Sequence, residues 1–105
     1  MKDLNNKVVL ITGASTGIGA ATAISFGKLG SKVIVNYNKS ADKADIIVNK
    51  INNAGGDAIA LQGDASKTGD MQNLIDKSVA NYGELNIMIN NAGGMIARSK
   101  IINLF

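Results

Sequence analysis

Short runs of apolar, mostly β-branched residues alternate along the chain with longer amphipathic segments. The apolar runs at residues 8–11, 33–35, 58–61 and 87–89 predict strands that are covered on both faces. Between them, apolar residues recur at helical spacing, as Ala44, Ile47, Val48 and Ile51 do at i, i+3, i+4 and i+7. We therefore expect helices near residues 17–29, 41–54 and 68–82.

The predicted helix ends carry the residues that commonly begin and end helices. Ser40 stands where a side chain would cap the second helix. Gly30, Gly55 and Gly83 each follow a helix, where a left-handed residue usually ends it.

The order β-α-β-α-β-α-β predicts one α/β domain over residues 1–105 with a parallel sheet, because each helix returns the chain to the same edge. Right-handed crossovers then give the strand order 3-2-1-4 of a Rossmann-type fold. The direction of sheet growth reverses between the first and fourth strands. Ligands of such sheets bind at this switch point, beyond the carboxyl ends of the strands.

Composition excludes several classes of site. The chain has no Cys and no His, which rules out a Cys/His zinc site and a Ser-His-Asp relay. The net charge of +3 comes from scattered lysines, so we expect no nucleic-acid partner. No apolar run has membrane-spanning length and residues 1–6 are too polar for a signal peptide, so we expect no membrane association and a cytoplasmic location.

A glycine-rich loop, Thr-Gly-Ala-Ser-Thr-Gly-Ile-Gly at residues 12–19, joins the first strand to the first helix. A helix N-terminus presents unpaired N–H groups to an anion, glycines let a pyrophosphate approach the backbone, and Ser15 and Thr16 could add hydroxyl donors. The loop lacks the lysine of an ATP-hydrolysing P-loop. The alternative is a turn that binds nothing.

These residues resemble the short-chain dehydrogenase/reductase family, whose cofactor loop reads Thr-Gly-x-x-x-Gly-x-Gly. Asp64, after the third strand, matches the family's acid at the adenine ring, and Asn90-Asn91-Ala92-Gly93 matches its Asn-Asn-Ala-Gly motif. The resemblance implies a dinucleotide cofactor bound by Gly13, Ser15, Thr16, Gly17, Ile18, Gly19, Asp64, Ala65, Asn91, Ala92 and Gly93. Asp64 could instead be a turn residue, and the two asparagines could simply satisfy backbone groups where the sheet ends.

The residues after the second strand bear on the choice of cofactor. An enzyme that prefers NAD has an acid there to bind the ribose 2′-hydroxyl. Residues 36–40 read Asn-Tyr-Asn-Lys-Ser, with no carboxylate before Asp42. Asn38 and Lys39 would tolerate a 2′-phosphate, which favours NADP(H) over NAD(H). Lys39 could also be only an exposed lysine at a helix start.

The family's catalytic Ser, Tyr-x-x-x-Lys and supporting Asn have no counterpart here. Ala41 stands four residues after Tyr37, and Asn86 four after Tyr82, where the resemblance requires lysine. We therefore assign no catalytic residue and expect the chain to be the N-terminal half of a Rossmann domain, inactive alone. The parent reaction would be hydride transfer between NADP(H) and an alcohol or carbonyl substrate. A non-catalytic nucleotide-binding module and a self-associating fold fragment are the alternatives.

Truncation after the fourth strand would leave that strand as an exposed apolar edge. The tail at residues 101–105, Ile-Ile-Asn-Leu-Phe, adds apolar surface without an evident place to pack. We therefore expect self-association through the fourth-strand edge.

Overall fold

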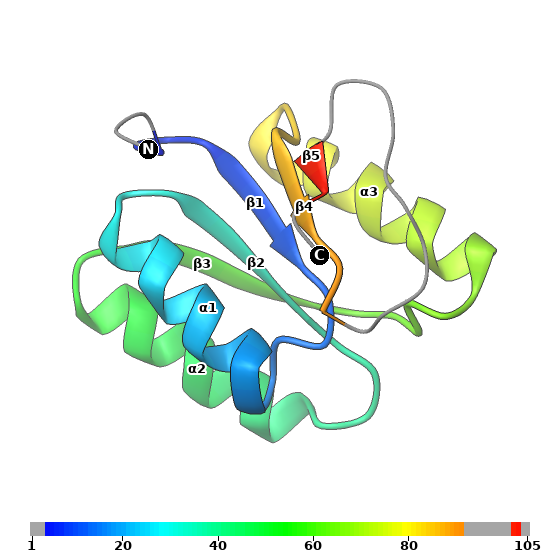
Figure 1. Ribbon diagram of the computed structural model, residues 1–105, viewed down its shortest axis with the longest axis horizontal. Helices are drawn as coiled ribbons and strands as arrows, with labels where there is room; N and C mark the ends of the chain where they lie inside the picture. Colours follow the sequence, from blue (N-terminus) through cyan, green and yellow to red (C-terminus); the bar gives the residue numbers. More distant parts are fainter. Residues whose placement is uncertain (1–3, 92–101, 104–105) are drawn as a thin grey trace.

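Three helices and a parallel sheet make up the fold (Figure 1). The computed structural model describes residues 4–91 and 102–103. The strands are β1 (Val8–Ile11), β2 (Lys32–Tyr37), β3 (Asp57–Gln62), β4 (Ile87–Ile89) and β5 (Ile102–Asn103). The helices are α1 (Gly17–Lys28), α2 (Ala41–Asn53) and α3 (Thr68–Tyr82). The expected helices and four expected strands are confirmed, with boundaries that shift by one or two residues.

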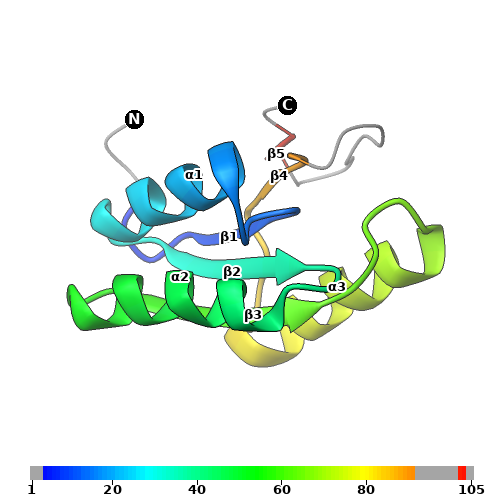
Figure 2. The same cartoon turned by 90° about the horizontal axis from the view of Figure 1, so that it is seen from below.

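The sheet has the order β3-β2-β1-β4-β5, and all its pairs are parallel. In β1, Val9 lies opposite Val33 of β2 and Ile87 of β4. The predicted order 3-2-1-4 is therefore confirmed, and the switch point lies between β1 and β4. The strands run in one direction across the sheet, so their carboxyl ends meet at one edge (Figure 2).

The fourth strand is not the unpaired edge that the sequence led us to expect. Ile87 pairs with Ile102, and Met88 with Asn103, in the two-residue strand β5. Residues 87–89 are at most 4% exposed, so the expectation that they would be poorly covered is also wrong. The tail contributes its own strand, which a pattern of only two residues could not reveal.

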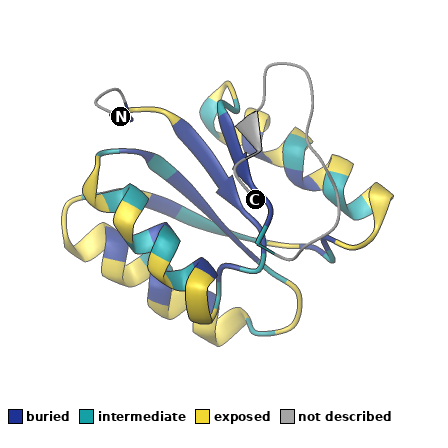
Figure 3. Cartoon of the chain, in the orientation of Figure 1, coloured by how far each residue is buried: buried dark blue, intermediate teal, exposed yellow. Residues whose placement is uncertain are grey.

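Alternate strand residues face two separate hydrophobic clusters. Val9 and Ile11 pack with α1 and α2 on one face, whereas Val8 and Leu10 pack with Leu74 of α3 on the other. Figure 3 shows β1, β2 and β4 as mostly buried and the outer faces of the helices as exposed. The sheet therefore forms a rigid platform for the loops at its carboxyl edge.

Helix ends are specified more by backbone geometry than by side-chain capping. Gly30, Gly55 and Gly83 have φ values of 87°, 91° and 86°, as expected for left-handed residues after a helix. Ser40 occupies the N-cap position of α2, but its side chain makes no capping hydrogen bond, so that part of the expectation is wrong. None of the helices in the described part of the chain is long and apolar enough to span a membrane.

Candidate functional site

The candidate site is formed by loops that leave the carboxyl ends of β1, β2, β3 and β4. The glycine loop runs from Thr12 to the start of α1, beside the switch point between β1 and β4. Asn38 and Lys39 follow β2, Asp64 follows β3, and residues 90–91 follow β4. The fold thus brings the segments predicted from sequence to one edge of the sheet.

Thr12 anchors the base of the glycine loop to the end of β4. Its backbone N–H donates to the carbonyl of Ile89 at 3.0 Å, and its hydroxyl lies 3.1 Å from Oδ1 of Asn90. Thr12 is fully buried and Asn90 is 3% exposed. These contacts support a structural role for Asn90 at the end of the sheet.

Two asparagines hold the peptide groups of Gly13 from opposite sides. Oδ1 of Asn36 accepts a hydrogen bond from the Gly13 N–H at 3.1 Å. Nδ2 of Asn91 donates to the Gly13 carbonyl, also at 3.1 Å. Gly13 itself has a φ of 60°, which favours glycine. The loop therefore begins in a conformation fixed from both β2 and β4.

Asn36 was not predicted as a site residue, although the sequence carries a signal at this position. Asn36 is a polar residue in the otherwise apolar second half of β2, and it is 2% exposed. A buried polar side chain in a strand is expected to have specific hydrogen-bond partners. The pattern could not identify them, because three of the four lie 23 to 27 residues away.

Gly17 and Gly19 are needed for different reasons. Gly17 has a φ of 61°, and a Cβ built on it would meet nothing within 4 Å. A Cβ on Gly19 would collide with the Gly13 carbonyl oxygen and lie 2.6 Å from Nδ2 of Asn91. The space beside Gly17 is therefore not filled by the described protein atoms. At Gly19 the expectation that glycine leaves room for a pyrophosphate is wrong, because the glycine loop and Asn91 already fill that space.

The start of α1 has the character of an anion site. Thr16 is the N-cap residue, and in the described structure its side chain makes no capping hydrogen bond to the helix. The first turn contains no acidic residue, and the N–H groups of a first turn lack partners within the helix. Thr16 and Gly17 are exposed, Ser15 is half-buried, and Ile18 is 72% exposed. Positive helix-dipole charge and accessible N–H groups therefore coincide here.

The segment after β2 lies beside the segment after β3. The side-chain amide of Gln62 donates to the Asn38 carbonyl at 3.0 Å, and the Gly63 N–H donates to the Tyr37 carbonyl at 2.9 Å. Asn38 and Lys39 are both exposed. Their exposure leaves both side chains accessible to a ligand at this edge.

Asp64 closes a turn through its own side chain. Its Oδ1 accepts hydrogen bonds from the Ser66 hydroxyl at 2.6 Å and the Ser66 N–H at 3.0 Å. These bonds, helped by the charges of Lys67 and Lys39, lower the pKa of Asp64 below its ordinary value. The turn-residue interpretation thus has direct support. Ala65 is 9% exposed, while Ala92 and Gly93 lie outside the described residues.

Replacing Ser66 with alanine should raise the pKa of Asp64 toward its ordinary value. The hydroxyl donates to the carboxylate, so its loss disfavours the charged form. An NMR titration of the Asp64 carboxyl carbon would measure the shift. Ser25→Ala, an exposed serine change in α1, serves as the control. Equal pKa values in the parent and Ser66→Ala would contradict the assignment.

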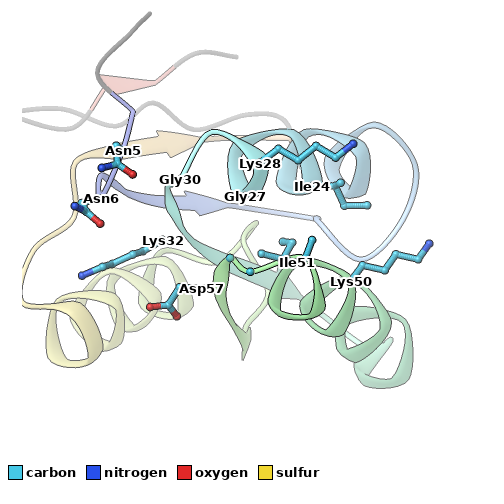
Figure 4. A pocket seen from close by; sticks show the side chains of 13 residues that line it. Asn5, Asn6, Ile24, Gly27, Lys28, Gly30, Lys32, Lys50, Ile51 and Asp57 are labelled. Carbon is cyan, nitrogen blue, oxygen red and sulfur yellow. The ribbon is translucent and has the colours of Figure 1, made fainter.

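A separate cavity of about 380 Å³ lies at the opposite, amino-terminal edge of the sheet. It is lined by residues before β1 and at the starts of β2 and β3, including Asn5, Lys32 and Asp57. Ile24 of α1 and Ile51 of α2 also line the cavity (Figure 4). Ligands of parallel α/β sheets bind beyond the carboxyl ends, so this cavity is not the candidate dinucleotide site.

The comparisons with known proteins point in the same direction as the geometry. The sequence profile of the short chain dehydrogenase family matches residues 7–104. Elsinochrome reductase 1 of Elsinoe fawcettii is 47% identical over 90 residues, which are 86% of this chain and 34% of that protein. The chain thus spans about a third of the length of the curated relatives it matches.

Solved structures share the fold as well. A short-chain dehydrogenase/reductase mutant from Serratia marcescens matches with a TM-score of 0.82 and 33% identity, over 89% of this chain and 38% of that one. The NADH-dependent reductase A1-R′ complexed with NAD matches with a TM-score of 0.81 and 37% identity. That match covers 93% of this chain and 40% of the reductase.

Proposed function

Because the chain belongs to the short-chain dehydrogenase family, we propose that its glycine loop binds the pyrophosphate of a nicotinamide dinucleotide. The observation that carries this proposal is the open space at Gly17, beside a helix start whose N-cap side chain makes no capping bond. An anion placed there would meet first-turn N–H groups and the positive end of α1. Gly13, Ser15, Thr16, Ile18 and Gly19 would form the rest of this loop, with Asn91 bracing it.

We further propose that the dinucleotide is NADP(H) rather than NAD(H). Lys39 would attract a 2′-phosphate, and Asn38 could donate to it. Residues 36–41 contain no carboxylate that would repel the phosphate. A matched solved structure is an NADH-dependent reductase, so membership of the fold does not decide the cofactor. Selectivity is expected to depend on residues 37–39.

For the whole protein we propose hydride transfer between NADP(H) and an alcohol or carbonyl substrate, with this chain as the N-terminal, cofactor-binding part. The reductase names of several relatives and their greater length support this proposal. In it, Asp64 and Ala65 would lie at the adenine, and Ala92 and Gly93 would line the cofactor's ribose. The cytoplasmic location and self-association stay predictions, although β5 occupies the fourth-strand edge through which self-association was expected.

A titration of the purified chain tests the binding proposal. Isothermal calorimetry with NADPH should show one site, with weaker binding of NADH. ATP, which has a triphosphate but no second nucleoside, distinguishes a dinucleotide site from a general anion site. Absence of any dinucleotide binding would overturn the proposal, and equal affinity for ATP would favour the simpler nucleotide-binding module.

The 105-residue chain should bind NADPH without oxidising it. The sequence contains no Tyr-x-x-x-Lys pair, and a positioned acid/base contributes about 10²–10⁴-fold to the rate of such reactions. Absorbance of the reduced nicotinamide, followed with a panel of ketones and aldehydes, should therefore stay constant. Turnover by the parent that is absent from a Gly17→Val variant purified in the same way would show that this chain does catalyse the oxidation of NADPH.

A further inference from the structure

Asn36 is a buried polar side chain whose hydrogen bonds reach both the glycine loop and the end of β3. It lies in β2 and is 2% exposed. Its Oδ1 accepts from the Gly13 N–H at 3.1 Å. Its Nδ2, which has two hydrogens to donate, lies within hydrogen-bonding distance of three carbonyls, those of Gly63 at 3.1 Å, Leu61 at 3.2 Å and Tyr37 at 3.3 Å. Both ends of one amide are thus engaged.

These hydrogen bonds join the two segments that the proposed function assigns to opposite ends of the adenosine diphosphate moiety. Gly13 is the second residue of the glycine loop, and Gly63 immediately precedes Asp64. The backbone also joins the glycine loop to β2, because the Ala14 N–H donates to the Asn36 carbonyl at 2.9 Å. A buried amide that loses a partner leaves polar groups unsatisfied, so Asn36 resists separate movement of the two segments.

We propose that Asn36 is a positioning residue that sets the spacing between the pyrophosphate loop and the Gly63–Asp64 segment, so that both engage one dinucleotide. This inference rests on the proposed function and adds to it a residue that binds no cofactor atom itself. The competing interpretation is that Asn36 only stabilises the sheet.

Asn52 provides the matched control. Its side chain also bridges backbone groups of β3: Oδ1 accepts from the Ala58 N–H at 2.8 Å and Nδ2 donates to the Ala58 carbonyl at 3.2 Å. It does so near the amino end of β3, away from the glycine loop. Asn52→Ala therefore removes side-chain hydrogen bonds to the same strand without touching the proposed site.

The test compares NADPH binding by the parent, Asn36→Ala and Asn52→Ala, at a temperature where circular dichroism shows all three folded. Asn36→Ala should raise the dissociation constant about tenfold or more, because it removes hydrogen bonds that hold the loop. Asn52→Ala should leave it within about twofold, because it alters none of them. Amide exchange adds a readout without ligand: the Gly13 N–H should exchange faster only in Asn36→Ala, and the Ala58 N–H only in Asn52→Ala.

The outcomes distinguish a failure of the proposed dinucleotide site from a failure of the positioning role of Asn36. A parent that binds no NADPH overturns the proposed function and this inference with it. Unchanged affinity in Asn36→Ala, or equal losses in both variants, overturns only the positioning role. If Asn36→Ala does not fold, NMR of the parent decides: NADPH should shift the side-chain amide signals of Asn36 and leave those of Asn52 in place. Unshifted Asn36 signals, with shifted loop amides, would overturn the inference.

Discussion

Gly17→Val should lose dinucleotide binding as its largest effect, whereas Gly19→Ala should mainly lose stability. At Gly17 the new side chain enters open space where we place the pyrophosphate, so the dissociation constant for NADPH should rise by roughly 100-fold or more, about 2.7 kcal/mol. The left-handed φ of 61° adds a folding cost of about 1–2 kcal/mol. Calorimetric titration and thermal melting measure the two effects separately.

Gly55→Val controls for the backbone strain of the Gly17 variant. Gly55 also has a positive φ, 91°, and a Cβ there would also meet nothing within 4 Å, but it follows α2 at the far edge of the sheet. It should lose comparable stability and keep its affinity for NADPH. Equal affinity in Gly17→Val and the parent would show that the phosphate site lies elsewhere.

For Gly19→Ala the collision is within the protein. The new methyl group would displace Asn91 or the Gly13 peptide, and overpacking of this kind costs about 1–3 kcal/mol. In a domain of this size each kcal/mol lowers the melting temperature by about 4–8 °C. Gly69→Ala in α3 is the control, since a Cβ there would meet nothing within 4 Å. A melting temperature unchanged from the parent would contradict the fit at Gly19.

Much of the fold followed from the sequence because its signals are local. Strand runs such as residues 8–11, helical spacing such as that around Ile47, and glycines after helices report on neighbouring residues, and the structure confirms them. Topology followed from general rules on handedness and parallel pairing. The glycine loop was found for the same reason, since its eight residues are contiguous.

The remaining features depend on contacts between distant residues. Asn36 gains its role only when β2 lies between the glycine loop and the end of β3. The need for glycine at position 19 depends on the side chain of Asn91, which is 72 residues later in the sequence and contacts Gly19 only in the folded chain. β5 is two residues long, too short for any periodic pattern. Ser40 matched a capping preference, but preferences of this size are readily overridden by the surrounding structure.

Tyr37→Asp should reverse or strongly reduce the proposed preference for NADPH over NADH. Tyr37 is the last residue of β2 and is half-buried, and its backbone carbonyl accepts the Gly63 N–H at 2.9 Å, a bond that the substitution leaves in place. A carboxylate at this strand end would accept a hydrogen bond from the ribose 2′-hydroxyl and repel a 2′-phosphate.

The size of the effect follows from the charges. Two unit charges 4 Å apart interact by about 1 kcal/mol in water and about 4 kcal/mol near a protein surface. The ratio of the two dissociation constants should therefore change by roughly 10- to 1000-fold. Calorimetric titration of each variant with NADPH and NADH gives the ratio directly, and a ratio cancels losses that affect both cofactors equally.

Tyr37→Asn separates the charge from the loss of the ring. The Tyr37 ring packs against the core cluster under α1 and α2, so either substitution removes the same apolar contacts. Asparagine has nearly the shape of aspartate without its charge, and it should leave the ratio within about threefold of the parent, a difference below about 0.7 kcal/mol. A large change in both variants would assign selectivity to the ring. An unchanged ratio in Tyr37→Asp would mean that the ribose lies away from the end of β2, and Lys39 would then lose its proposed contact as well.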